Sequence, residues 1–183
     1  MARTLMFAAS LVMSLHANGT FGQTIEVSLN SKATHRGKPV FWDQGFVALM
    51  ERDGRIVTFS PSEAKSFRKL SGSFRSFSQS ELRGQLMREF GSSFDVSGTG
   101  QYLVVHPAGQ RDRWAQRFEQ LYRSMVQYFR ARGFQTERPE FPFTAVAFPT
   151  KAHYENYMRQ QKVDIGFNSL GYYDPTSNRI HLY

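Results

Sequence analysis

The chain has 183 residues, 40% of them hydrophobic and 15% aromatic, which is enough apolar material for one ordinary domain or two small ones. The 17 phenylalanines argue against a disordered chain, and because no stretch reaches 18 consecutive apolar residues we expect no transmembrane helix. The lack of cysteine excludes a disulfide scaffold, a zinc ribbon and a thiol nucleophile. The net charge of +8 bears on partners and solubility rather than on the fold.

The first 23 residues have the layout of a secretory signal peptide. Arg3 supplies a positive charge, residues 4–15 form a short apolar run, and small residues follow. Ala17 and Gln23 are the two candidate last residues before cleavage. A buried N-terminal helix is the alternative, but the apolar run has no polar face. We therefore predict that residues 1–23 are a signal peptide and that the protein is secreted or periplasmic.

Residues 24–97 are predicted to form a β-rich, basic region with one helix. A weakly alternating strand is expected at 25–29. The apolar runs 46–50 and 56–59 flank Asp53-Gly54, and Asp-Gly between two such runs is a strong hairpin signal because both residues tolerate a positive φ. The sequence therefore predicts a hairpin here.

The rest of this region is expected to be one irregular segment and one helix. Residues 60–78 are rich in Ser, Lys and Arg, and we interpret them as an irregular segment that packs its three phenylalanines on the hairpin. Ser78 and Glu81 have the spacing of a capping box, and Gly91 is a typical residue after a helix. A helix is therefore predicted over 78–90.

Residues 98–183 are predicted to form an α+β domain in the order β-α-β-α-β-β, with an antiparallel hairpin last. The expected elements are a strand at 102–106, a helix at 111–132, a strand at 143–148, a helix at 150–161, and hairpin strands at 171–173 and 179–183. The 111–132 helix has the clearest pattern, because its apolar residues recur at helical spacing. This stripe is expected to face one core with Val104, Val146 and Phe148, and it consists of Trp114, Phe118, Leu121, Met125 and Phe129.

The histidines of the chain do not form a metal-binding motif. His16, His35, His106, His153 and His181 are widely separated, and no H-E-x-x-H sequence is present. His106 and His181 are expected at strand ends, where a histidine more often has a structural role than a metal-binding one. We therefore predict no catalytic residue, no metal ligand and no cofactor in this chain.

Motifs for nucleophilic, phosphate-binding and nucleic-acid sites are also missing. There is no G-x-S-x-G, and the cluster at 98–100 is too short for a phosphate-binding loop. Residues 32–90 hold 11 Lys or Arg against 6 Asp or Glu, with Phe67, Phe74 and Phe77 among them, as in some single-strand binding sites. A basic solvated face is the simpler interpretation, so we expect no nucleic-acid partner.

A series of segments resembles a family of exported bacterial proteins that has long been classed as a domain of unknown function. Complete members of that family are similar to gluzincin-type zinc metallopeptidases. No single motif is diagnostic, but the order of the segments is fairly specific. The segments that carry the resemblance are 52–55, 82–91, 102–107, Trp114, 121–122, 140–142, 146–149 and 171–179.

The resemblance implies that residues 98–183 correspond to the first half of a gluzincin-type peptidase domain. In that family a zinc helix with H-E-x-x-H follows the 171–179 hairpin, whereas this sequence ends before such a helix. No residue here matches the zinc ligands or the general base, and zinc is expected only if a downstream H-E-x-x-H exists. We therefore expect a truncated chain without catalytic activity by itself.

The resemblance also implies a role for the last strand. In gluzincins the strand before the zinc helix is a sheet edge on which an extended substrate lies. By resemblance, this substrate-edge strand would consist of Arg179, Ile180, His181, Leu182 and Tyr183. An ordinary exposed hairpin is the alternative. An uncovered edge and an uncovered apolar sheet face would also favour self-association.

The sequence leaves three candidate functions. The first, which we predict, is an exported, metallopeptidase-like protein that meets a peptide or protein substrate but is inactive by itself. The second is an extracytoplasmic binding module in which residues 24–90 hold a peptide or an anionic envelope polymer. The third is an intracellular nucleic-acid binder, which the signal peptide disfavours.

Overall fold

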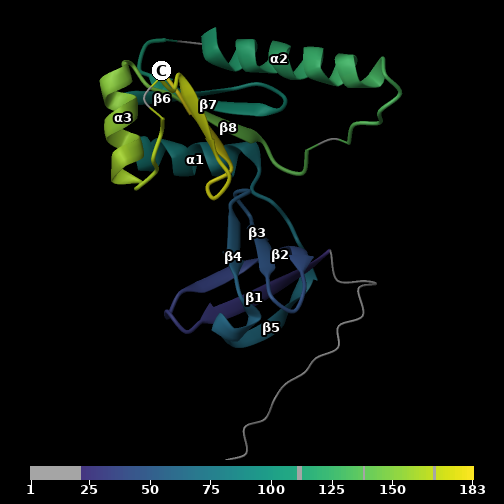
Figure 1. Cartoon of the computed structure of the whole chain (residues 1–183). Helices are drawn as coiled ribbons and strands as arrows, with labels where there is room; N and C mark the ends of the chain where they lie inside the picture. The colour runs from purple at the N-terminus through teal and green to yellow at the C-terminus, as the bar shows by residue number, and fades with distance from the viewer. Residues whose placement is uncertain (1–21, 111–112, 138, 167) are drawn as a thin grey trace, which may run out of the picture.

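The computed structural model describes residues 22–110, 113–137, 139–166 and 168–183. Within these residues the chain forms three helices and ten strands, and the strands make two five-stranded sheets (Figure 1). The expected α+β class is therefore confirmed. The predicted signal peptide lies outside the described residues except for Gly22 and Gln23.

The first sheet is antiparallel and has the strand order β4-β3-β2-β1-β5. Its strands are β1 (Gln23–Leu29), β2 (Thr34–Trp42), β3 (Val47–Glu51), β4 (Ile56–Phe59) and β5 (Ala64–Ser73). The predicted hairpin is confirmed as β3 and β4. The side chains buried in its core are Ile25, Val27, Val47, Leu49 and Phe59.

Residues 60–78 are not an irregular segment. They contain a short 3-10 turn (Pro61–Glu63) and then β5, which pairs with β1 along its length. Because β5 is an edge strand, only a few of its side chains reach the core, among them Phe67. The remaining Ser, Lys and Arg side chains face solvent, so the strand lacks the apolar alternation that would have revealed it.

β2 was also missed, because Gly37 and Pro39 are residues that strands usually avoid. The glycine is required by a close approach of two strands. A Cβ atom added at Gly37 would lie 2.2 Å from the backbone oxygen of Met50 on β3. Only glycine fits at this place in the sheet.

The predicted helix over 78–90 is confirmed as α1 (Gln79–Phe90). The Ser78 hydroxyl accepts a hydrogen bond from the Glu81 amide, and the Glu81 carboxylate accepts one from the Ser78 amide. An unpredicted strand, β6 (Phe94–Gly98), follows. β6 is a strand of the second sheet and contributes Val96 to its core, and α1 packs on that sheet through Leu82 and Leu86. The boundary expected at 97/98 therefore assigns both elements to the wrong sheet.

The second sheet has the order β6-β7-β8-β10-β9, with β7, β8 and β10 parallel and the outer strands antiparallel. Its further strands are β7 (Tyr102–Pro107), β8 (Phe143–Ala147), β9 (Gly171–Asp174) and β10 (Arg179–Leu182). Between them come α2 (Arg113–Arg130) and α3 (Lys151–Gln160), the latter capped by Thr150. The predicted order of elements is therefore confirmed.

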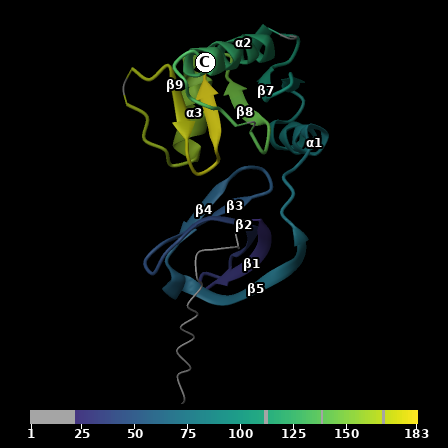
Figure 2. The ribbon, with the colours of Figure 1, turned by 90° about the vertical axis from the view of Figure 1, so that its right-hand side faces the viewer.

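Helices lie on both faces of this second sheet. α1 and α3 pack on one face, around Leu103, Val105, Val146 and Phe148. α2 packs on the opposite face, around Tyr102, Val104 and Ala145. Figures 1 and 2 show the resulting three layers, with the first sheet below them.

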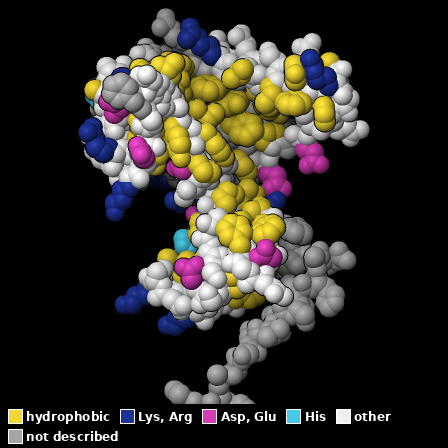
Figure 3. All heavy atoms as spheres, in the orientation of Figure 1, with side chains coloured by type: hydrophobic (Ala, Val, Ile, Leu, Met, Phe, Trp, Pro, Cys, Tyr) yellow, Lys and Arg dark blue, Asp and Glu magenta, His cyan; other side chains and the backbone are white. Residues whose placement is uncertain are grey.

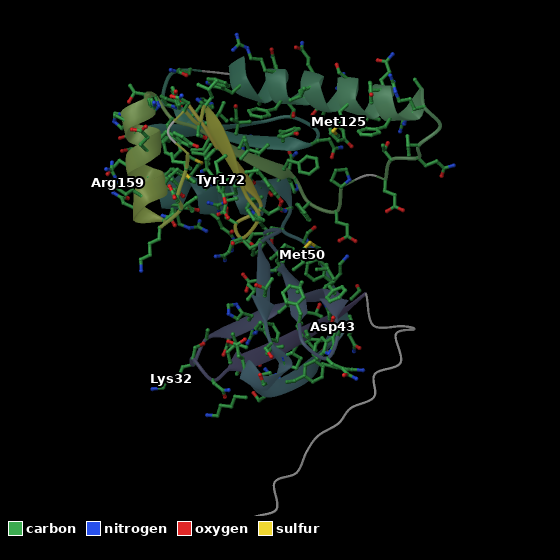
Figure 4. All side chains as sticks on the ribbon, viewed as in Figure 1. Lys32, Asp43, Met50, Met125, Arg159 and Tyr172 are labelled. Carbon is green, nitrogen blue, oxygen red and sulfur yellow. The ribbon has the colours of Figure 1, made fainter. Side chains whose placement is uncertain are left out.

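The two sheets meet through the turn between β3 and β4. The Ile56 amide donates to the Thr176 carbonyl oxygen at 3.2 Å, and the Phe77 amide donates to the Arg52 carbonyl oxygen at 2.7 Å. Met50 lies at the end of β3 that faces the second sheet (Figure 4). The β3–β4 turn is therefore joined to the β9–β10 hairpin and to the segment before α1.

Candidate functional site

The predicted substrate-edge strand, Arg179 to Tyr183, does not lie at an edge. β10 pairs with β8 on one side and with β9 on the other. Its backbone groups are therefore already used in the sheet, and β9 is the edge strand next to it. The prediction failed because β10, the second strand of the hairpin, pairs with β8, which leaves the first strand, β9, at the edge of the sheet. The spacing of a hairpin in the sequence does not reveal which of its two strands will be the edge strand.

The side chains of this strand divide between the two faces of the sheet. Ile180 packs on the face that α2 occupies, and alternation places Leu182 on the same face. His181 and Tyr183 face α3, where the His181 ring lies 5.3 Å from the Tyr157 ring and the Tyr183 ring 5.6 Å from the Tyr154 ring. The five residues therefore do not form one site.

The apolar stripe of α2 is only partly buried. Trp114, Phe118 and Tyr122 pack on the sheet, and the Phe118 ring stacks at 5.2 Å from the Tyr102 ring. Leu121 is 63% exposed, and Met125 is 45% exposed. The expected core also differs in its partners, because Val146 and Phe148 belong to the opposite face.

Length explains why the second half of α2 stays uncovered. A helix of 18 residues is about 27 Å long. A strand of six residues, such as β7, spans only about 20 Å. The helix therefore extends beyond the sheet, and side chains that would meet a longer sheet face solvent instead.

Exposed apolar side chains gather around this uncovered half of α2. Figure 3 shows them as a band that continues from α2 onto the sheet below it, and Figure 4 labels Met125 beneath the helix. We call this surface the open apolar face, and its most exposed members are Leu121, Met125, Tyr128, Phe129 and Phe134. Contiguous surfaces of this kind mark interaction sites in soluble proteins.

Ring contacts order much of the open apolar face. The Phe129 ring lies 5.5 Å from the Tyr128 ring and 5.9 Å from the Phe134 ring, in edge-to-face arrangements. Beside them, a hollow of about 380 Å³ runs along α2 and is lined by Tyr122, Arg123, Val126, Gln127, Arg130 and Ala131. Packed rings present a fixed surface at little conformational cost.

The border of the open apolar face is basic. Residues 120–134 contain Arg123, Arg130 and Arg132 and no acidic residue. The Arg132 guanidinium lies over the Tyr128 ring at 3.5 Å and donates a hydrogen bond to the Tyr128 carbonyl oxygen. Arg132 therefore stands next to the exposed Tyr128 ring, whereas Arg123 and Arg130 line the hollow on the other flank of α2.

One carboxylate lies at the base of this surface. Glu119 accepts hydrogen bonds from the Thr99 hydroxyl at 2.8 Å and from Arg123 Nε at 3.1 Å. Burial by itself would raise the pKa of Glu119, but these bonds and one from the Gln101 amide lower it below its ordinary value. Glu119 is therefore charged at neutral pH and holds the β6–β7 turn against α2.

Among the described residues, no group of three His, Asp or Glu side chains stands close enough together to hold a metal ion. The described histidines have separate surroundings: His35 pairs with Glu51 at 3.0 Å, His153 lies beside the Thr150 cap, and His106 and His181 are buried. No helix in the described part of the chain is long and apolar enough to span a bilayer.

Comparison of the chain with protein-family models, with curated proteins and with solved structures found no match.

Proposed function

We propose that this protein is a binding module that holds a partner polypeptide on the open apolar face. The observation that carries the proposal is the uncovered half of α2, where exposed Leu, Met, Tyr and Phe side chains are bordered by three arginines. The partner segment would be amphipathic, with apolar side chains that cover the rings and acidic side chains that pair with the arginines.

Charge complementarity identifies an acidic segment as the occupant. A second copy of the chain docked face to face on this surface would bring Arg130 and Arg132 of one molecule close to those of another, which costs energy. The chain's own residues 1–21 are apolar but include no Asp or Glu, so they offer the arginines no partner. An acidic amphipathic segment satisfies both the apolar and the charged parts of the surface.

The shape of the surface also favours a polypeptide over a membrane. Tyr122 and Val126 are partly covered and line the hollow beside α2, where an inserted side chain reaches them but a flat bilayer does not. Phe143, beneath the helix, is also only half-buried. We also infer that the protein works outside the cytoplasm, which rests on the apolar run and Arg3 at the start of the sequence.

Binding of designed peptides, followed by fluorescence anisotropy, tests the proposal. An amphipathic peptide with Leu, Phe and Glu should bind, and the same peptide with Lys in place of Glu should not. Met125→Gln should weaken binding at least about fivefold, since one buried apolar side chain contributes more than about 1 kcal/mol. Arg130→Glu should weaken it further.

The matched control is Met87→Gln. Met87 is an exposed methionine, 53% accessible, on α1 and away from the open apolar face, so its replacement should leave binding unchanged. Equal effects of Met125→Gln and Met87→Gln would contradict the proposal. Binding to vesicles of anionic phospholipid without binding to the acidic peptide would assign this surface to membranes instead.

A further inference from the structure

A small pocket lies where the first sheet meets the second, away from the open apolar face. Its volume is about 260 Å³. Polar residues from three places line it: Asp53 and Arg55 at the β3–β4 turn, Gln85 and Glu89 on α1, and Asp174, Ser177, Arg179 and His181 on the β9–β10 hairpin. Tyr157 and Met158 of α3 close one side.

Most charges in the pocket are paired with one another. Arg179 Nη1 donates to Glu89 Oε1 at 2.7 Å, and Arg55 Nε donates to Asp53 Oδ2 at 2.7 Å. Asp174 accepts bonds from the Thr176 amide and the Ser177 hydroxyl, and these lower its pKa although burial opposes them. Three carboxylates face two guanidinium groups, so the lining carries one net negative charge.

Among the residues that line this pocket, His181 is buried and has a ring nitrogen without a hydrogen-bond partner in the described chain. The residue is 2% exposed, and among the described residues its Nδ1 has no hydrogen-bond partner. Burial and the nearby Arg179 lower the pKa of His181 to about 4, so the ring is neutral at pH 7 and has one acceptor nitrogen. A buried ring nitrogen without a partner destabilises the fold, because it has lost its hydrogen bond to water.

We propose that this pocket binds a primary ammonium group, carried by a small amine or by a lysine side chain of another polypeptide. An ammonium group has three N–H donors and one positive charge. The pocket offers the charge and two acceptors to match: the Glu89 carboxylate, whose Oε2 accepts no bond within the described chain, and the Asp174 carboxylate, with the His181 ring in the lining beside them.

Size and aromatic lining agree with this assignment. A volume of about 260 Å³ lies below the usual range of pockets for drug-sized ligands but is large enough for an alkylammonium group. The Tyr157 phenol stays neutral, since burial raises its pKa, and its ring would attract a cation. A carboxylate or phosphate ligand would instead add to the net negative charge.

Titration of the whole chain with ethylammonium chloride, followed by NMR of the His181 ring nitrogens, tests the proposal. Ethylammonium should shift these signals saturably, and sodium acetate at equal ionic strength should not. Glu89→Gln should weaken binding about tenfold, since a hydrogen bond to a charged group contributes 1.5–3 kcal/mol. The control Glu155→Gln changes an α3 carboxylate that does not line the pocket and should have no effect.

Three results would overturn the assignment: no saturable shift, saturable binding of acetate, or a Glu89→Gln variant that binds ethylammonium like the parent chain. A second ligand distinguishes between the two possible sources of the ammonium group, a free amine and a lysine side chain. If Nα-acetyl-lysine-N-methylamide, whose side-chain ammonium group is free, binds at least tenfold more tightly than ethylammonium, the natural ligand is a lysine side chain. Equal affinities indicate a free amine.

Discussion

At the scale of single residues, the environment of His181 predicts how stability depends on pH. Its pKa is about 4 in the folded chain, because burial and Arg179 disfavour the charged ring, while Asp174 and Glu89 only partly oppose them. In the unfolded chain a histidine titrates near 6.5. Between these values the unfolded chain binds a proton that the folded chain does not, so stability decreases as the pH is lowered from 6.5 towards 4.

We expect a loss that approaches about 3 kcal/mol as the pH falls from 6.5 to 4. Urea unfolding at several pH values measures it. His181→Phe should remove this part of the pH dependence, whereas His153→Gln, at an exposed position on α3, should keep it. A pH dependence that survives in His181→Phe would show that another group is responsible.

Gly54 tests the contact between the two sheets. Its φ of +88° disfavours any other residue, and an added Cβ would lie 3.0 Å from the Phe141 ring and from Asn178 Nδ2. Gly72 has a similar φ of +93° but open space around it. We expect Gly54→Ala to cost about 1 kcal/mol more than Gly72→Ala, from overpacking. Equal unfolding free energies for the two variants would show that the contact contributes nothing.

At the scale of elements, the apolar stripe of α2 has some side chains packed on the sheet and others exposed. Phe118→Ala removes a ring that stacks on Tyr102 and should cost about 2–4 kcal/mol. Leu121→Ala changes a side chain that is 63% exposed and should cost under about 0.5 kcal/mol. Chemical denaturation of the two variants measures their free energies of unfolding. Similar losses for both variants would mean that Leu121 is buried in solution.

The elements also show which patterns the sequence carries. α1 and α3 were predicted because a capping residue marks each start: Ser78 with Glu81, and Thr150. The β3–β4 hairpin was predicted because Asp53-Gly54 marks its turn. β5 and β2 carry no such marker, since an edge strand is mostly polar and a close approach requires glycine. Caps and turns could be read from the sequence, but these two strands could not.

At the scale of the whole molecule, export remains a prediction that N-terminal sequencing of protein from the native host would test. The first sheet narrows the expected cleavage site. Gly22 accepts a hydrogen bond from the Phe74 amide, and Gln23 pairs with Ser73 in β1. Cleavage after Gln23 would remove both of these contacts with the end of β5. We therefore expect the mature chain to begin between Asn18 and Gly22. An intact Met1 or Ala2 would contradict export.

The gluzincin resemblance and the metallopeptidase-like function also remain predictions. Neither the comparisons nor the packing of the described residues bears on them. The structure does correct the inferences that depended on a substrate-edge strand, because β10 is internal and β9 is the edge. Self-association through an uncovered edge would therefore use β9 or β6 rather than Arg179 to Tyr183.

The sequence by itself determined the α+β class, the order of elements after residue 98 and the scattered placement of the histidines. These depend on local periodicity, caps and turns, which neighbouring residues specify. It also placed an apolar stripe on α2, but it did not determine how much of that stripe is buried.

Only the tertiary structure decided which strand is the edge, where α2 stops contacting the sheet, and that Glu89, Asp174 and His181 share a pocket. The physical reason is that strand order and burial depend on contacts between residues far apart in the chain. Glu89 and Arg179 form an ion pair across 90 positions. Periodicity within either segment contains no information about the other.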